Sequence, residues 1–190
     1  MQMYVMRHGT TEWNEQGITQ GRTNNLLSAR GVAQTEEVAE NYAEVEFDAI
    51  YVSPLMRTRQ TASIMNAEHN VPIIQDARLL EIDQGIFAGR SKEGLTPEEK
   101  LLKKTRGLGS GMESFESALL RARDFVEDMS ANCPYEKVLV ITHNIIAGFL
   151  EDVLLGIEVD FTTNKHIREF KNAEIKLFDT DKMPNINPEM

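Results

Sequence analysis

The chain has almost no cysteine and no long apolar run. Its single cysteine, Cys133, cannot form an internal disulfide. No apolar stretch approaches the roughly 20 residues that a membrane-spanning helix needs, and no charged start is followed by an apolar signal core. These absences predict a cytoplasmic protein that does not contact a membrane.

Basic residues are also scarce. The 190 residues include 20 Lys and Arg against 30 Asp and Glu, which gives a formal net charge of −10. Nucleic acids and anionic membranes need clustered cations, so this balance argues against both as partners. The hydrophobic content of 41% is enough for one core. We expect one domain over residues 1–180 and a frayed tail over 181–190, which contains Pro184 and Pro188.

Three apolar runs end in residues that bind anions or transfer protons. Met3–Met6 leads to Arg7 and His8, and two further runs end as follows: Ala49–Val52 before Ser53 and Arg57, and Val138–Thr142 before His143. Ligands of open parallel α/β sheets bind outside the carboxyl ends of the strands. The three ends therefore predict a cationic pocket for a small anion, with a nucleophile inside it.

In the rest of the sequence, segments with the apolar spacing of a helix alternate with segments typical of a strand. Expected helices cover about 28–44 (capped by Ser28), 54–68 (with Pro54 in the first turn), 114–129 (capped by Ser114) and 145–155 (ending at Gly156). Expected strands cover 49–52, 71–74, 137–142 and a final segment around Ile175 and Leu177, which we expect to be an antiparallel edge. This order predicts an α/β fold with a mostly parallel sheet.

Between residues 90 and 112 the sequence is polar and rich in glycine, which predicts a mobile lid over the pocket. This lid, with Thr10, Arg22 and Phe87, is expected to form the pocket rim. Its cations Lys103, Lys104 and Arg106 fit an acidic substrate, but such a group more often forms a solvated face.

Arg7 and His8 together suit phosphoryl transfer. Imidazole is an uncharged nucleophile near neutral pH, and guanidinium matches pairs of phosphate oxygens. Neutral His8 would attack phosphorus while Arg7, Arg57 and His143 hold the charge on the oxygens, and water would then hydrolyse the phosphohistidine.

The leaving alkoxide needs an acid, and Glu81 is the preferred candidate, with Asp83 as its local rival. His8, His143 and Glu81 would also suffice in number for a metal site. Arg7 and Arg57 would repel a divalent ion, so we expect neither a metal nor another cofactor.

The motifs resemble those of the histidine phosphatase superfamily, the phosphoglycerate mutase-like fold, from Met3 to Leu177. The matching segments are Arg7-His8-Gly9-Thr10-Thr11-Glu12-Trp13-Asn14, Ser53-Pro54-Leu55-Met56-Arg57 with Gln60-Thr61-Ala62, Glu81 with Gly85 and Gly89, Glu113-Ser114, Arg121, His143 and Asn172-Ala173. The resemblance implies a three-layer αβα sandwich, a phosphohistidine on His8, and substrate-facing roles for Asn14, Gln20 and Gly21.

Departures from the family pattern occur at Thr10, Ala88 and Asn144. Asn144 replaces a small residue after the second histidine, beside the expected phosphoryl site. The other two histidines, His69 and His166, are expected to be solvated.

The short chain and the sequence Glu81-Ile82-Asp83-Gln84-Gly85 favour hydrolysis of a small phosphorylated metabolite over phosphoglycerate mutase activity. A non-catalytic phosphate-binding module is the alternative from another class. The sequence indicates neither the substrate nor the oligomeric state.

Overall fold

The computed structural model describes residues 1–161 and 168–183. Its centre is one five-stranded sheet in the order β3-β2-β4-β1-β5. The strands are β1 (Gln2–Arg7), β2 (Ala49–Val52), β3 (Ile73–Gln75), β4 (Lys137–Thr142) and β5 (Ile175–Asp179). Only β5 is antiparallel to its neighbour, β1. The mostly parallel sheet with an antiparallel edge is therefore confirmed.

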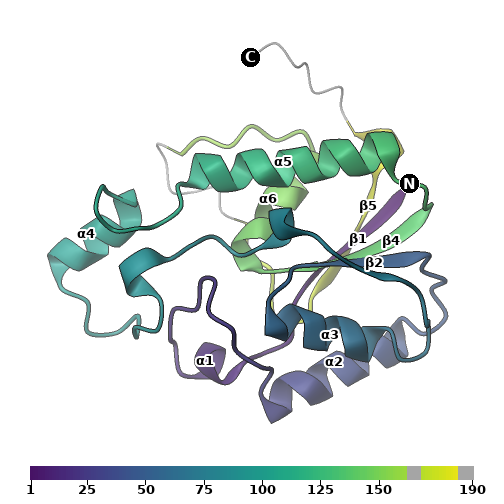
Figure 1. Cartoon of the computed structure of the whole chain (residues 1–190), viewed down its shortest axis with the longest axis horizontal. Helices are drawn as coiled ribbons and strands as arrows, with labels where there is room; N and C mark the ends of the chain where they lie inside the picture. The colour runs from purple at the N-terminus through teal and green to yellow at the C-terminus, as the bar shows by residue number, and fades with distance from the viewer. Residues whose placement is uncertain (162–167, 184–190) are drawn as a thin grey trace.

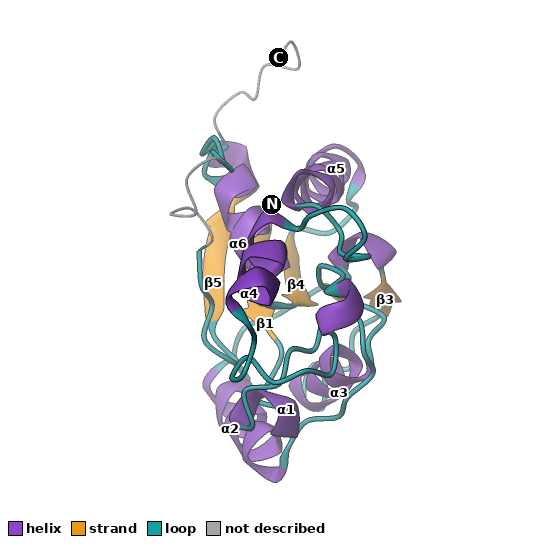
Figure 2. Cartoon of the chain, turned by 90° about the vertical axis from the view of Figure 1, so that its left-hand side faces the viewer, coloured by secondary structure: helices purple, strands orange, loops and turns teal. Residues whose placement is uncertain are grey.

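Helices cover both faces of the sheet, which confirms the three-layer arrangement (Figures 1 and 2). α5 (Phe115–Asn132) and α6 (Asn144–Leu154) lie on one face, and α2 (Ala29–Asn41) and α3 (Met56–Met65) lie on the other. Short elements complete the fold: α1 (Glu12–Glu15), α4 (Pro97–Thr105), and the 3₁₀ helices η1 (Ala77–Leu79), η2 (Gly85–Phe87) and η3 (Thr180–Lys182).

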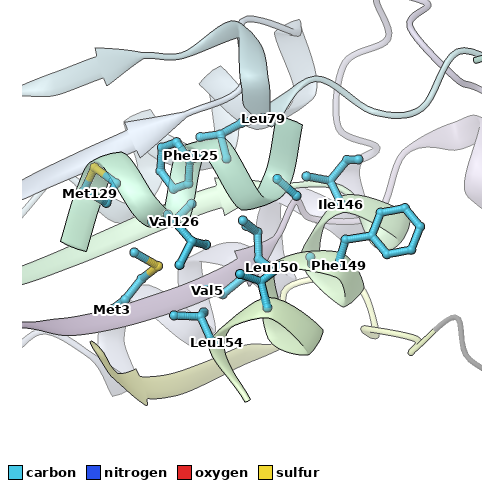
Figure 3. Packing of buried hydrophobic residues seen from close by; sticks show 14 of the residues in the cluster. Met3, Val5, Leu79, Phe125, Val126, Met129, Ile146, Phe149, Leu150 and Leu154 are labelled. Atoms are coloured by element: carbon cyan, nitrogen blue, oxygen red, sulfur yellow. The ribbon is translucent and has the colours of Figure 1, made fainter. Parts of the chain in front are cut away.

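Alternation along the central strands divides the core into two layers. Met3 and Val5 of β1 pack against α5 and α6, as Figure 3 shows, whereas Met6 packs with the residues under α2 and α3. In the larger layer, Phe125 and Phe149 are completely buried. The two layers fix β1 and β4 from both sides, so the loops that follow these strands start from a rigid base.

Two expected helix caps are confirmed, since the side chains of Ser28 and Ser114 accept hydrogen bonds from backbone N–H groups in the first turns of α2 and α5. The expectation for Pro54 is wrong, because α3 begins at Met56 and Leu55 is its N-cap. The hydroxyl of Thr58 donates to the carbonyls of Ser53 and Leu55, which stabilises a bend before the helix.

The segment 90–112, which we expected to be a mobile lid, contains α4. Thr96 and Glu99 form a reciprocal capping box at its start. At the other end of the chain, η3 and Met183 are ordered against the sheet edge, and the rest of the expected tail, 184–190, lies outside the described residues. Among the described residues, no helix is both long enough and apolar enough to cross a membrane.

Candidate active site

The ends of β1 and β4 bring the two predicted site histidines together. Arg7 pairs with Thr142 in the parallel register, so His8 and His143 leave adjacent strands side by side. Their ring centroids are 5.2 Å apart, and the backbone N–H of His8 donates to the carbonyl of Thr142 at 3.0 Å. A cavity of about 140 Å³ opens beside His8. Its lining includes seven of the eight predicted site residues: Arg7, His8, Asn14, Gln20, Gly21, Arg57 and Glu81.

His8 is held in one tautomer. Its Nδ1 lies 2.7 Å from the carbonyl of Gly9, to which it donates, and Nε2 accepts a hydrogen bond from Nε of Arg57 at 3.2 Å. Burial, reinforced by the charges of Arg57 and Arg7, lowers the pKa of His8 well below its usual 6.5. The ring is therefore neutral, and the lone pair on Nε2 points to Nε of Arg57, a residue that lines the same cavity.

The backbone after His8 has no room for a larger residue. A Cβ at Gly9 would lie 2.5 Å from Oγ1 of Thr35 and 2.8 Å from the carbonyl of Gly31. The Gly9 N–H donates to Oγ1 of Thr61 at 3.1 Å, and Nδ2 of Asn172 donates to the carbonyl of His8 at 3.1 Å. Contacts from α2, α3 and the segment before β5 therefore fix the loop that carries His8.

Backbone carbonyls hold both guanidinium groups. Arg57 donates to the carbonyls of Thr23 at 2.7 Å and Gly21 at 2.8 Å, and Nη1 of Arg7 donates to the carbonyl of Phe170 at 2.6 Å. No carboxylate forms a salt bridge with either arginine in the part of the chain that the structure describes. Burial lowers the pKa of Arg57 to about 10 and also lowers that of Arg7, yet both stay charged at neutral pH.

His143 is completely buried and is not part of the cavity lining. Its Nε2 forms a hydrogen bond with Oγ of Ser53 at 2.8 Å, and its Nδ1 has no hydrogen-bond partner among the described residues. Burial, followed by the charge of Arg57, lowers the pKa of His143 well below 6.5. Sequence reasoning gave Ser53 no role of its own, although its place at the end of β2 was a usable signal.

Glu81 lies in the cavity wall with only 9% of its surface exposed. Its Oε1 accepts a hydrogen bond from the N–H of Ile82 at 2.9 Å. Burial raises the pKa of Glu81 above its usual 4.5, against the opposing pull of that hydrogen bond and of Arg57 and Arg7. Its rival, Asp83, does not line the cavity; its Oδ1 instead accepts from the N–H of Gly85 at 2.8 Å. The geometry favours Glu81 as the acid.

Glu113 ties the Glu81 segment to its surroundings. Its carboxylate accepts from Arg121 at 2.8 Å, from Arg22 at 3.0 Å and from the N–H of Asp83 at 3.2 Å. Nε of Arg22 also donates to the carbonyl of Glu81 at 3.1 Å. Arg22 therefore supports the acid's backbone, and the ion pair of Arg121 reaches the site through Glu113.

The three residues that the resemblance implies as substrate contacts line the cavity, and each also bonds to a neighbouring part of the chain. Oδ1 of Asn14 accepts from the N–H of Thr11 in a capping box. Gly21 has a φ of +53°, which favours glycine, and its carbonyl holds Arg57. Oε1 of Gln20 accepts from Asn25 at 3.3 Å. Of these residues, only Asn14 and Gln20 offer side chains to a substrate.

The expected rim needs correction. Phe87 is completely buried, and Thr10 is buried with its hydroxyl bonded to Gln34 at 2.9 Å, so neither lines the cavity. Arg22 does not line it either, whereas Lys92, from the expected segment 90–112, does line it together with Asn144. Asn144 was identified in the sequence only as a departure from the family pattern.

The cations near α4 do not form one solvated face. Nζ of Lys103 donates to Oγ1 of Thr19, a cavity residue, at 2.7 Å and lies 5.5 Å from the ring centroid of Phe87. Arg106 donates to the carbonyls of Asp83 and Glu113, whereas Lys104 is exposed. Burial and the charges of Lys92, Arg106 and Arg90 lower the pKa of Lys103.

The other two histidines lie away from the cavity or outside the described residues. His69 is half-buried, with its ring 5.0 Å from that of Phe47, so it is solvated only in part. His166 lies outside the described residues. No group of three or more His, Cys, Asp or Glu side chains within residues 1–161 and 168–183 is arranged to hold a metal ion.

A strand-end cavity with a neutral imidazole and two free guanidinium charges defines a site for phosphoryl chemistry. The chain belongs to the histidine phosphatase superfamily (branch 1), whose sequence profile matches residues 3–184. It is 30% identical over 190 residues to the probable phosphoglycerate mutase GpmB of Enterobacter sp. (strain 638), covering 97% of this chain and 87% of that protein. It is 32% identical over 163 residues to the protein of the same name from Serratia proteamaculans (strain 568), covering 83% and 76%.

Solved structures share the fold. A putative alpha-ribazole-5′-P phosphatase from Escherichia coli superposes with a TM-score of 0.83 at 23% identity, over 94% of this chain and 90% of the other. A mycobacterial glucosyl-3-phosphoglycerate phosphatase gives 0.80 at 22% identity, over 93% and 88%. These neighbours confirm the phosphoglycerate mutase-like architecture.

Proposed function

We propose that this chain is a metal-independent phosphomonoester hydrolase in which His8 is the nucleophile and Glu81 the general acid and base. One observation carries the proposal: Nε2 of a neutral, tautomer-fixed His8 lies in a cavity shared with Glu81 and with two arginines held by carbonyl oxygens. Two uncompensated guanidinium charges favour a phosphate dianion and oppose a divalent metal ion at the same place.

In the first step, Nε2 of His8 attacks phosphorus and the bond between phosphorus and the ester oxygen breaks. Protonated Glu81 gives its proton to the departing oxygen, so that an alcohol leaves. Nε of Arg57 moves its hydrogen bond from Nε2 to a phosphoryl oxygen, and Arg7 stabilises the remaining charge. His143 lies behind the cavity lining with its ring 5.2 Å from that of His8, and it completes the clamp as a donor from Nδ1–H in the tautomer whose Nε2 accepts from Ser53.

In the second step, a water molecule attacks the phosphohistidine. Ionised Glu81 takes a proton from this water, the bond between phosphorus and Nε2 breaks, and inorganic phosphate leaves. His8 is again neutral and Glu81 again protonated, so the cycle closes without an external reagent.

The substrate we propose is a small phosphorylated metabolite that carries a second acidic group. A cavity of about 140 Å³ excludes large ligands, and Lys92 and Lys103 place cations on its side nearest α4. Relatives and neighbours whose names include phosphoglycerate agree with this class. The net charge of −10 argues against nucleic acid, and the lone cysteine is consistent with our placement of the enzyme in the cytoplasm.

Phosphoglycerate mutase activity is the second candidate, because the similar proteins from Enterobacter and Serratia carry that name. A mutase must shield its phosphohistidine from water until the bound intermediate takes the phosphoryl group back. Incubation with 3-phosphoglycerate separates the two: a hydrolase releases phosphate, whereas a mutase forms 2-phosphoglycerate.

The central experiment is to trap the phosphoenzyme. The protein is mixed with a ³²P-labelled phosphomonoester, quenched in base, and the label located by peptide mapping. We expect a base-stable, acid-labile label on His8, none in His8→Ala, and unchanged labelling in the control His69→Gln. An unlabelled wild-type protein that still binds phosphate would support the non-catalytic binding module.

A further inference from the structure

Asn144 contacts the segment that holds Arg7. Its Oδ1 accepts a hydrogen bond from the N–H of Phe170 at 3.0 Å, and the carbonyl of the same residue accepts from Nη1 of Arg7 at 2.6 Å. Phe170 is therefore bonded on one side of its backbone to the first residue of α6 and on the other side to a guanidinium of the cavity.

α6 supports this segment over three successive turns. Asn144 provides the hydrogen bond, and one turn later a Cβ at Gly148 would lie 2.5 Å from the carbonyl of Arg168. A further turn along, Asp152 pairs with Arg168 at 2.8 Å. Positions 144, 148 and 152 are four residues apart and therefore lie on one face of α6. The segment 168–170 runs along this face, in contact with it.

The other supports of Phe170 act on its side chain. The ring is buried, and Nζ of Lys176 lies 4.1 Å from its centroid while pairing with Glu151 at 2.8 Å. These contacts hold the ring and do not bond the peptide N–H. Asn144 supplies the one side-chain hydrogen bond to that N–H among the described residues.

We propose that Asn144 is a positioning residue for Arg7, acting through the backbone of Phe170. In this chain the direction of the Arg7 guanidinium therefore depends on the Asn144 amide. The inference rests on the proposed function only in taking Arg7 as a ligand of the phosphoryl group.

The test compares Asn144→Ala with the matched control Asn132→Ala, in which the lost amide bonds only to Asp128 on the exposed side of α5. Orthovanadate affinity is measured by calorimetry, and the ¹⁵N–¹H signal of the Arg7 Nε group is followed by NMR. We expect Asn144→Ala to weaken vanadate binding about tenfold, the effect of one hydrogen bond, and to shift the Arg7 signal. Asn132→Ala should change neither.

A double-mutant cycle with Arg7→Lys identifies the route of the effect. If Asn144 acts through Arg7, adding Asn144→Ala to Arg7→Lys should weaken vanadate binding by less than twofold further. Full additivity, or an unshifted Arg7 signal in Asn144→Ala, would overturn the proposal.

Gly148→Ala offers a second variant that leaves Asn144 intact. Its Cβ would push on the carbonyl of Arg168, and we expect the same direction of change in vanadate affinity and in the Arg7 signal. Because vanadate binding requires no turnover, a wild-type protein that binds vanadate without hydrolysing esters would contradict the proposed function and leave this test intact.

Discussion

Nε of Arg57 donates to Nε2 of His8 across 3.2 Å, so the free site pairs a permanent cation with the lone pair of its nucleophile. This contact keeps protons away from Nε2, because a second positive charge there would face the guanidinium at close range. It must also break before phosphorus can reach Nε2. In the reaction we propose, Arg57 therefore has two roles: it keeps His8 unprotonated in the free protein, and it stabilises the phosphoryl oxygens once substrate is bound.

Removing Arg57 should affect both roles. In Arg57→Ala we expect the pKa of His8 to rise, and kcat/KM for a phosphomonoester to fall by at least about 100-fold, as for the loss of one charge-stabilising group. NMR titration of His8 and steady-state kinetics measure the two effects. The exposed neighbour Arg59 gives the control Arg59→Ala, which should leave both unchanged. A His8 pKa that stays low in Arg57→Ala would show that burial alone keeps the ring neutral.

The pH dependence of activity should follow Glu81. The first step needs neutral His8, whose pKa is well below 6.5, and protonated Glu81, whose pKa burial raises above 4.5. We therefore expect kcat/KM to decrease as pH rises through the pKa of Glu81. Glu81→Gln should lose this decrease and keep only the part that belongs to ionisation of the substrate. If kcat/KM depended on pH in the same way in both proteins, the decrease would come from ionisation of the substrate and not of Glu81.

Stability should depend on pH through the same carboxyl group. Because the pKa of Glu81 is raised in the folded state, its contribution to stability is fully present below pH 4.5 and is lost as pH rises through the folded pKa. The free energy of unfolding of Glu81→Gln minus that of wild type should therefore be larger at pH 8 than at pH 4. The increase is about 1.4 kcal/mol for each tenfold difference in proton affinity between the folded and unfolded states. Urea unfolding of both proteins at the two pH values measures this. A difference that does not change with pH would contradict a raised pKa.

Lys103 and Lys104 are neighbours on α4 with different surroundings, which makes them a matched pair. Lys103 reaches the cavity residue Thr19, and Lys104 is exposed. With 3-phosphoglycerate, Lys103→Met should raise KM about tenfold, whereas with glycerol 3-phosphate, which lacks the carboxylate, KM should stay within twofold. Lys104→Met should change neither value. Equal effects of Lys103→Met on both substrates would point to a structural role instead.

The strands that carry the site could be predicted because their signal is local. Apolar runs followed by Arg7-His8 and by His143 indicated β1 and β4, and parallel pairing then brought the two rings together. The contact between Ser53 and His143 was missed, although the place of Ser53 at the end of β2 was a usable signal. The preference of proline for the first helical turn predicted a helix start at Pro54, whereas α3 begins at Met56, after a bend in which Thr58 bonds to the carbonyls of Ser53 and Leu55.

Sequence reasoning also missed α4 and the role of Phe170, for two separate reasons. α4 carried a readable signal, Thr96-Pro97-Glu98-Glu99, which is a capping box with proline in the first turn, but the surrounding glycines outweighed it. No sequence pattern predicted that Phe170 holds Arg7, because it does so through its backbone carbonyl, which does not depend on the side chain. A sequence indicates which side chains a site can use, but seldom which main-chain atoms hold them.

The carbonyl oxygens around Arg7 and Arg57 have a cost as well as a benefit. They accept hydrogen bonds from Nη1 of Arg7 and from both Nη groups of Arg57 without cancelling the charge of either guanidinium group, so the site attracts any tetrahedral oxyanion that fits. Inorganic phosphate, the product of hydrolysis, is one of these. Turnover should consequently slow as free phosphate accumulates, which makes the rate of this enzyme sensitive to the phosphate level of its surroundings.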